Sequence, residues 1–226
     1  TPAGEFDTGP IPVNSTFLVK IAGDVPAGNY EARIVGRFGV SNPRPFQISL
    51  GEEVKDNAAN RSKDTAQEVA VGNVITGTTE ASNIDYYKVH LTAGQRVLAD
   101  CWAHRLDSRA NVSLVLFDAA GTQIAVSHDH NGYDPLLDFT AEAEADFMIG
   151  VYDFVYAGGG DHTYRLHITS GPVVDYIVPS SGAAGSNASY TIVGRNLPGG
   201  KPLDGVTLDG APLQSLQTNV QIPAEG

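Results

Sequence analysis

Short runs in which apolar and polar residues alternate dominate this chain, and they predict many β-strands rather than helices. In the run DYYKVHL, Tyr87, Val89 and Leu91 fall on one side of an extended strand, while Lys88 points to the other side. Such alternation is typical of a sheet with one buried and one solvated face. Further runs of this kind are VSLVLF at 112–117, FMIGVY at 147–152 and TYRLHI at 163–168.

Turn-forming residues separate these runs, as at Ala120-Gly121 and Asn131-Gly132. Strong helix signals are nearly absent. The segment 56–68 has the length of a short helix but lacks an apolar stripe, so it is interpreted as polar linker. The chain is therefore predicted to be all-β, with a β-sandwich as its main architecture.

The spacing of the runs divides the chain into four parts. The first part is residues 1–50, with strands predicted at 16–21, 29–35 and 45–50. The polar linker 51–67 follows. The third part is residues 68–171, with about eight strands, and the fourth is residues 172–226, with three or four more. The third part has enough strands for one sandwich or jelly roll. Each end part has too few strands to close a sandwich, and a piece this small rarely buries a sufficient core alone.

The two end parts would complete each other if they were joined in the reverse order. Residues 172–226 followed by residues 1–50 make 105 residues, which is close to the ~100 residues of an immunoglobulin-like domain. We therefore expect the ends to be complementary fragments of a single sandwich. The fragments would meet either by strand complementation between copies or within one continuous polypeptide of repeats.

Composition narrows the partners that such a chain could have. Among its 226 residues, 26 acidic side chains outnumber 14 basic ones, which gives a net charge of −12 and a pI near 4.7. This balance lacks the positive surface that nucleic acids or anionic membranes require, so divalent cations are better candidate partners. No apolar run approaches the ~18 residues of a membrane span.

The chain begins at Thr1 without an initiator methionine or a signal peptide, so we expect a processed product or a piece of a longer protein. Cys101 is the only cysteine, which excludes an internal disulfide and a cysteine-rich zinc site. It lies in an apolar run beside Trp102 and is expected to be a core thiol.

Two segments near the ends resemble the halves of one domain family. VDYIVPSSGAAGSNASYTIVGRNLP at 174–198 has a Pro-x-x-Gly turn and then a strand running into Gly-x-Asn-Leu. VPAGNYEARIVGRFGVSNPRPFQISL at 25–50 has a Pro-x-Gly-x-Tyr turn, a strand and then Gly-x-Ser-Asn. The first resembles the opening half of an IPT/TIG immunoglobulin-like domain, and the second resembles its last two strands. The resemblance implies that the halves occur in reversed order around a middle domain.

The middle of the chain resembles the bacterial pre-peptidase C-terminal (PPC) domain. The similar segments are EVKDN at 53–57, IDYYKV at 84–89 and DHNGYDPLLDF at 129–139. Lys55 departs from the family pattern, where Glu or Pro is commoner, and this weakens a cation site there. The resemblance implies a jelly-roll sandwich that serves as an accessory module of secreted proteases or large surface proteins. Such modules bind matrix, space or cap other domains, sometimes bind calcium, and are not catalytic.

Two sets of oxygen-bearing side chains are candidate calcium ligands. Asp129, Asn131 and Asp134 lie at short spacing around Gly132, which permits the tight turn that calcium loops use. The full EF-hand spacing is missing, and an Asx turn without an ion is the alternative. The second set comes from the PPC resemblance, because in collagen-binding relatives an acidic linker folds back onto the sandwich around calcium. Its members here are Glu53, Asp56, Asn57 and Asp85, and the alternative is a solvated acidic linker.

No catalytic motif is present. The sequence has no G-x-S-x-G, no H-E-x-x-H and no P-loop, so we expect no enzymatic activity. His128 and His130 flank Asp129 and could share a strand face toward a transition metal, but no third ligand is evident. Exposed histidines beside a loop are the simpler interpretation.

These patterns lead to a main hypothesis and two alternatives. The main one is a non-catalytic extracellular or cell-surface module that assembles head-to-tail with copies of itself into a fibre or array. The first alternative is a module that binds a matrix polymer or carbohydrate for a larger secreted enzyme. The second is a folding or targeting part of a secreted peptidase.

Overall fold

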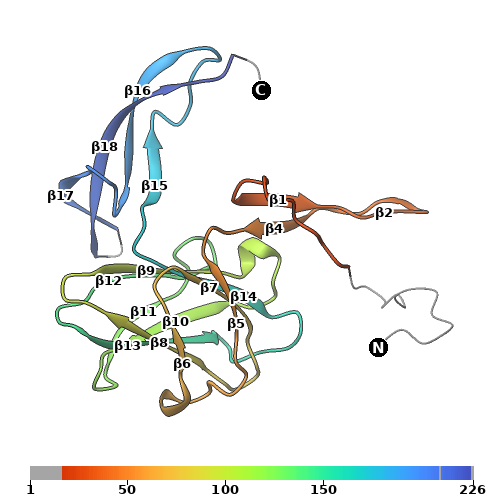
Figure 1. The fold of residues 1–226 in the computed structure, drawn as a ribbon, viewed down its shortest axis with the longest axis vertical. Coiled ribbons are helices and arrows are strands. Elements are labelled where there is room, and N and C mark those ends of the chain that lie inside the picture. The colour runs from red at the N-terminus through yellow and green to blue at the C-terminus, as the bar shows by residue number, and fades with distance from the viewer. Residues whose placement is uncertain (1–16, 209, 225–226) are drawn as a thin grey trace.

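The chain forms β-strands and two short 3₁₀ turns in the computed structural model, which describes residues 17–208 and 210–224 (Figure 1). The strands fall into three regions: an N-terminal hairpin, a central sandwich and a C-terminal sheet. This arrangement confirms the predicted all-β class with a β-sandwich as its main architecture.

Two five-stranded sheets make up the central sandwich. The first has the order β11 (Gln123–Ser127), β10 (Val112–Phe117), β13 (Ala145–Asp153), β8 (Asp85–Leu91) and β6 (Gln67–Val69). The second has the order β12 (Leu136–Thr140), β9 (Arg96–Trp102), β14 (Thr163–Thr169), β7 (Asn73–Thr78) and β5 (Glu52–Lys55). Neighbouring strands are antiparallel except at the β6 and β5 edges, where each edge strand runs parallel to its neighbour.

The core of the sandwich follows from the alternation seen in the sequence. Tyr87 and Val89 on β8 are 0% exposed, and so are Val97 and Ala99 on β9 of the other sheet. The two sheets therefore bury their inward faces against each other, as aligned sandwich sheets do. β10 is buried along its whole length.

The segment 51–67, expected to be a polar linker, lies on the sandwich. β5 pairs with β7 along its full length, with Glu53 opposite Val74. The 3₁₀ turn η1 (Lys63–Thr65) follows and leads into β6, which pairs with β8. Lys63 sits 3.8 Å above the centre of the Phe117 ring and donates a hydrogen bond to the carbonyl of Gly121. This segment therefore contains the edge strand β5 of one sheet and leads into the edge strand β6 of the other.

The N-terminal region is a hairpin that projects from the sandwich (Figure 1). β1 (Gly28–Ala32) pairs with β4 (Arg44–Ile48), and the short β2 (Val35–Gly36) and β3 (Gly39–Val40) extend the hairpin toward its tip. The prediction of a strand at 16–21 is wrong for residues 17–21, and Thr16 lies outside the described residues. The run FLVKI is apolar, but none of the described strands lies beside it to supply the hydrogen bonds of a ladder.

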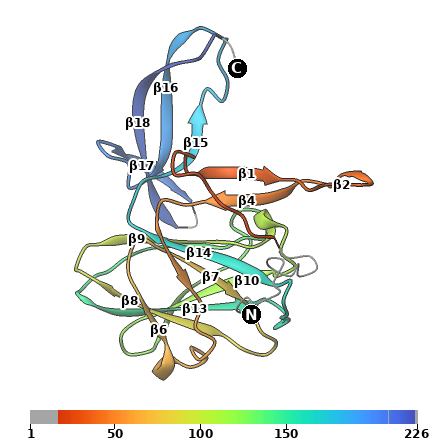
Figure 2. The same cartoon turned by 45° about the vertical axis from the view of Figure 1, so that its right-hand side comes forward.

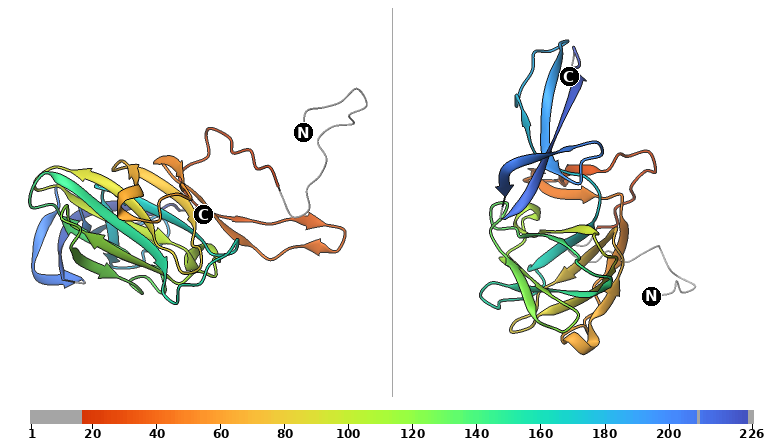
Figure 3. Two further views of the ribbon diagram at one scale, coloured as in Figure 1. Left: turned by 90° about the horizontal axis from the view of Figure 1, so that it is seen from below. Right: turned by 90° about the vertical axis from the view of Figure 1, so that its left-hand side faces the viewer.

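The C-terminal region is one four-stranded sheet that stands on the sandwich (Figure 1, Figure 3). Its order is β15 (Val173–Val178), β16 (Asn187–Arg195), β18 (Ala211–Gln221) and β17 (Lys201–Leu208). All its pairings are antiparallel. The described part of the chain puts no second sheet over it.

Candidate assembly surfaces and buried carboxylate clusters

The C-terminal sheet has an apolar face and a more polar face on its two central strands. Ile192 on β16 is directly opposite Leu216 on β18 and Ile177 on β15, so these three side chains share one face. The same face carries Tyr190 and Val220. We call these five residues the apolar face. The central strands place on the other side Ser189, Thr191, Val193, Ser215, Gln217 and Asn219.

The apolar face is partly open to solvent. Ile177 is 44% exposed and Val220 is 37% exposed, Ile192 and Leu216 are half-buried, and Tyr190 is buried. A hollow of about 210 Å³ lies over this face, between Ile177, Ile192 and Val220, next to the segment 179–182. Contiguous apolar surface of this kind on a folded protein usually marks a contact with another chain or ligand.

The foot of the sheet is fixed to the sandwich by a buried arginine. Arg195 is 1% exposed, and its Nε lies 2.8 Å from Asp138 on β12 while its Nη1 lies 3.0 Å from Asp175 on β15. Arg96 pairs bidentately with Asp138 and also donates to the carbonyl of Pro212 on β18. Burial raises the pKa of Asp175, and the Arg195 charge opposes this rise. We call this group of ion pairs the joint.

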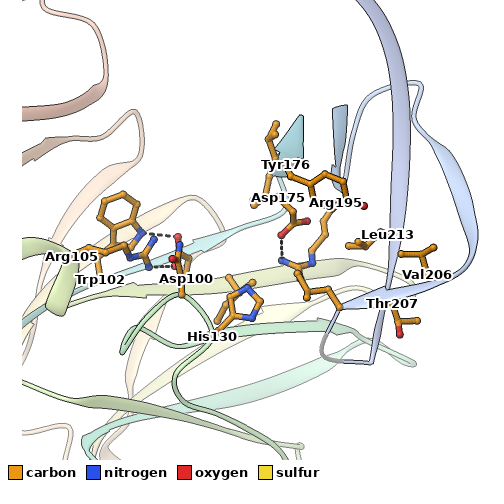
Figure 4. Close-up of a pocket in the computed structure, with 15 residues that line it drawn as sticks. Asp100, Trp102, Arg105, His130, Asp175, Tyr176, Arg195, Val206, Thr207 and Leu213 are labelled. Atoms are coloured by element: carbon orange, nitrogen blue, oxygen red, sulfur yellow. Dashed lines mark hydrogen bonds and ion pairs between the residues drawn. The ribbon is translucent and has the colours of Figure 1, made fainter. Parts of the chain in front are cut away.

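A cavity of about 670 Å³ lies beside the joint, between the sandwich and the C-terminal sheet (Figure 4). Arg105 stacks over the Trp102 ring at 3.9 Å and pairs with Asp100 at 2.6 Å. The Trp102 Nε1 donates to the same carboxylate. The charged groups that line this cavity are therefore mostly paired with one another. They help to hold the C-terminal sheet on the sandwich.

The N-terminal hairpin also has two different faces. Tyr30 is opposite Phe46, and Gly28 is opposite Ile48, so these positions share an apolar face. On the other face, Gln47 accepts a hydrogen bond from Arg165 of β14. Arg165 also donates to Ser49, and Arg44 of β4 pairs with Asp107 at 3.0 Å, so the hairpin base is tied to the sandwich.

Beyond its base the hairpin exposes large apolar side chains. Val35 is 77% exposed and Phe38 is 90% exposed near the tip. Leu18, in the preceding extended segment, is fully exposed. Both end regions therefore carry apolar surface that the described residues leave uncovered.

The first candidate calcium set does not converge. Asp134 is 0% exposed and turns inward, where its carboxylate accepts bonds from the backbone N–H groups of residues 103–105 and from Arg105 Nε. It fixes the turn η2 (His104–Leu106) to the loop instead of facing an ion. Asp129 and Asn131 stay exposed, and Asn131 and Asp134 exchange backbone hydrogen bonds around the turn at Gly132.

The second candidate set is also divided. Glu53 is held by Arg165 and Ser49; burial raises its pKa, but these hydrogen bonds outweigh that effect and leave the pKa below its ordinary value. The side-chain oxygen of Asn57 accepts a bond from the Ala59 N–H. Only Asp56 and Asp85 belong to one buried network. Within the described residues, no group of three or more His, Cys, Asp or Glu side chains is placed to hold a metal ion. The predicted set thus does not fit calcium as a unit, and calcium binding stays a prediction.

Asp56 and Asp85 are the ends of a chain of four oxygen atoms inside the sandwich. Tyr87 Oη lies 2.6 Å from Asp56 Oδ1 and 2.5 Å from Tyr164 Oη, which lies 2.8 Å from Asp85 Oδ2. Three contacts between oxygens need three protons, and the two phenols supply two. A proton on one carboxyl completes the chain. Burial raises the pKa of Asp85 to about 6, with the nearby Asp56 charge adding to it and the Tyr164 hydrogen bond opposing it.

The sequence interpretation missed the arginines that organise these sites. Arg165 lies within the predicted strand TYRLHI, and Arg195 stands where a predicted strand runs into Gly-x-Asn-Leu. A basic residue in such a run signals a buried ion pair, because an unpaired charge there is costly. The spacing gives no indication of which carboxylates are the partners.

Cys101 is fully buried, as expected from its apolar run, and burial raises the pKa of its thiol. No described helix is both long enough and apolar enough to cross a bilayer.

Comparison with known proteins gives limited likeness. No protein-family model and no curated protein matches the chain. Among solved structures, it is similar to the pre-peptidase C-terminal domain of collagenase from Bacillus anthracis, at 17% identity and a TM-score of 0.39 over 46% of this chain and 94% of that one. It is also similar to PliG of Salmonella Typhimurium, a periplasmic inhibitor of g-type lysozyme, at 17% identity and a TM-score of 0.29 over 53% and 98%. Likenesses of this size do not assign the chain to a family.

Proposed function

We propose that this chain is a non-catalytic structural module of an extracellular assembly, joined head-to-tail to further copies through its two end regions. The observation that carries the proposal is the C-terminal sheet, a single layer whose apolar face is left open. A sheet with one apolar face is stable only when another layer covers that face. The N-terminal hairpin supports the proposal because it too leaves apolar side chains uncovered.

Assembly of this kind propagates. The hairpin and the C-terminal sheet are different surfaces, so a contact between them is heterologous and extends into a filament unless a ring closes. Neighbouring copies could be separate chains or successive repeats of one polypeptide, and the same contact would serve in both cases.

Sedimentation analysis and electron microscopy of the 226-residue chain over a range of concentrations test the proposal. We expect the mass to rise with concentration and linear particles to form. A chain of two full copies fused head-to-tail represents covalent repeats. In it, the C-terminal sheet of the first copy should melt at a higher temperature than the C-terminal sheet of a single copy. A single copy that stays monomeric, together with a fused pair that melts identically to it, would exclude the proposal.

A second candidate function is binding of a matrix polymer or carbohydrate, and one observation favours it. The rings of Tyr152 and Tyr156 stack with their centroids 5.3 Å apart. Phe154 is 55% exposed, and its ring stacks on His128 with the centroids 5.7 Å apart. Exposed aromatic faces of this kind suit extended polymers. Co-sedimentation with collagen, chitin and cellulose tests this function, with a Phe154→Ala, Tyr156→Ala variant as the control.

A further inference from the structure

The strand order of the C-terminal sheet indicates what is missing from it. In chain order its strands are arranged first, second, fourth, third. An immunoglobulin-type sandwich places strands A, B, E and D in one sheet and C, F and G in the other. When C is left out, A-B-E-D has this same order. Only five residues, 196–200, separate β16 from β17, so this region has no strand C between them. The four strands correspond to one complete layer, and the layer they lack is a facing sheet.

The N-terminal hairpin has the properties of that facing layer. F and G are neighbouring antiparallel strands in the second sheet, as β1 and β4 are here. The hairpin has a face on which Tyr30, 38% exposed, lies beside the half-buried Phe46 and Ile48, with Arg44 at its edge paired to Asp107. Sheet-on-sheet packing requires such a face, because it buries the inner side chains of both layers.

Charge does not oppose this contact. Residues 17–50 are net basic, with Lys20, Arg33, Arg37 and Arg44 against Asp24 and Glu31. The described residues of the C-terminal region are balanced, with Arg195 and Lys201 against Asp175 and Asp204. Two hairpins would therefore repel each other, whereas a hairpin and a C-terminal sheet would not.

The two layers are held apart within one copy. At the base of the hairpin, Arg165 of the sandwich donates hydrogen bonds to Gln47 and Ser49, and Arg44 of β4 pairs with Asp107 at 3.0 Å. Arg195 and Asp138 fix the foot of the sheet to another part of the sandwich. The hairpin and the sheet then leave the sandwich in different directions (Figure 1, Figure 2). Because both bases are fixed to the sandwich in this way, a hairpin that covers the apolar face comes from another copy.

We propose that the apolar face of the C-terminal sheet takes the β1–β4 hairpin of a second copy as a facing layer, so that the two end regions close one sandwich across the contact. This inference rests on the proposed head-to-tail function. It differs from strand addition, in which the hairpin would pair with the open edge of β15 or β17 and leave the apolar face uncovered.

Two substitutions at adjacent positions of β16 test the face. Ile192 lies on the apolar face and Thr191 on the opposite one, and both side chains are half-buried. In the full chain, Ile192→Asp should weaken association by about 100-fold or more, since it places a charge in the closed layer. Thr191→Asp should leave association within a few-fold. Ile177→Asp, at a more exposed position of the same face, guards against a folding defect and should act like Ile192→Asp.

Cysteine pairs identify the occupant. A mixture of Ile192→Cys chains and Phe46→Cys chains should give a disulfide-linked heterodimer on mild oxidation, while Ser215→Cys chains mixed with Phe46→Cys chains should not. The buried Cys101 thiol serves as an internal control, since it should not react. Cross-linking of Ile192→Cys chains only to each other would mean that two C-terminal sheets pack together, and it would overturn the inference.

The outcomes separate the inference from the function on which it rests. If the unchanged chain and its fused pair show no association, the proposed function fails. If the chain assembles and Ile192→Asp and Ile177→Asp assemble equally well, the proposed function stands and the facing-layer inference is wrong, because edge addition leaves those positions outside the contact.

Discussion

The central sandwich and the C-terminal sheet share one sequence pattern, but only the sandwich is closed by a second layer. On β8 the inward residues Tyr87 and Val89 are 0% exposed, whereas Ile177 and Val220 on the apolar face of the C-terminal sheet are 44% and 37% exposed. Both regions alternate apolar and polar residues in the way that one buried face requires. The comparison teaches that alternation of apolar and polar residues predicts which face of a sheet is buried. It does not predict whether the layer packed on that face comes from the same chain or from another.

The difference in burial between the two regions should appear in the free energy of unfolding. Fully burying an isoleucine is worth roughly 1.5–3 kcal/mol, and a half-exposed one contributes less. The sandwich therefore has its own core, while the C-terminal sheet depends on the joint and on whatever covers its apolar face.

The largest expected effect is in the sandwich core. Ile149 on β13 is 0% exposed, so Ile149→Ala should lower the free energy of unfolding by about 3–4 kcal/mol through lost burial and the cavity left behind. Ile192→Ala on the apolar face should cost under about 1 kcal/mol in dilute protein. Urea denaturation of both variants measures the contrast, and equal losses would mean that the apolar face is already covered within a single chain.

How far the sequence could predict this molecule follows from the same contrast. The strands at 85–91 and 112–117 coincide with β8 and β10, because alternation and local turns define such elements directly. The sequence of 51–67 predicts a linker, because β5 and the adjoining β6 are short and polar and form only by pairing in parallel with β7 and β8. Pairing between distant segments leaves little local signal.

The candidate sites were harder to predict for a related reason. A carboxylate in a loop can face solvent and ions, or it can turn inward and cap the backbone. Asp134 does the second, while Asp129 in the same loop stays exposed. The deciding partners are the backbone of residues 103–105 and the Arg105 side chain, about 30 residues away in the chain. Spacing within the loop contains no information about them.

Those two aspartates give the second prediction. Asp134→Asn should lower the free energy of unfolding by about 3 kcal/mol, because the amide cannot accept all the bonds that the buried carboxylate accepts and removes the negative charge that faces Arg105 Nε. Asp129→Asn is the matched control and should stay within about 0.5 kcal/mol. Thermal melts of both variants, with and without added calcium, provide the measurement. A calcium-dependent loss in Asp129→Asn would instead indicate an ion in this loop.

The third prediction concerns pH and Asp85. Its folded pKa of about 6 lies above the ordinary 3.8, so the folded state holds its proton more tightly than the unfolded state. This stabilisation is complete below about pH 3.8 and is lost as pH rises through about 6. The loss amounts to roughly 2–3 kcal/mol. Asp85→Asn keeps a donor toward Tyr164 at every pH and should remove this part of the pH dependence.

Denaturation of the wild type and of Asp85→Asn at pH 4, 6 and 8 tests the sign. The variant should be more stable than the wild type at pH 8, by about 1–2 kcal/mol, and the two should converge toward pH 4. The change should appear in the transition of the sandwich, since the oxygen chain lies between its two sheets. A variant that is less stable at pH 8, with an unchanged pH profile, would show that Asp85 is ionised and needed in that form.

The smallest effect is expected at the joint between the two regions. Arg195 reaches both Asp138 and Asp175, and a lysine carries its charge at one point and cannot bridge both carboxylates. Arg195→Lys should therefore cost about 1 kcal/mol, confined to the foot of the C-terminal sheet. Hydrogen exchange should become faster in β15 and β16 while β8 and β10 stay protected, because the sandwich core does not involve this pair. Arg33→Lys, in an exposed pair with Glu31, should leave exchange unchanged everywhere. If Arg195→Lys instead loosened the sandwich to the same extent as the sheet, the two regions would unfold as one cooperative unit, and the open sheet would draw its stability from the closed sandwich below it.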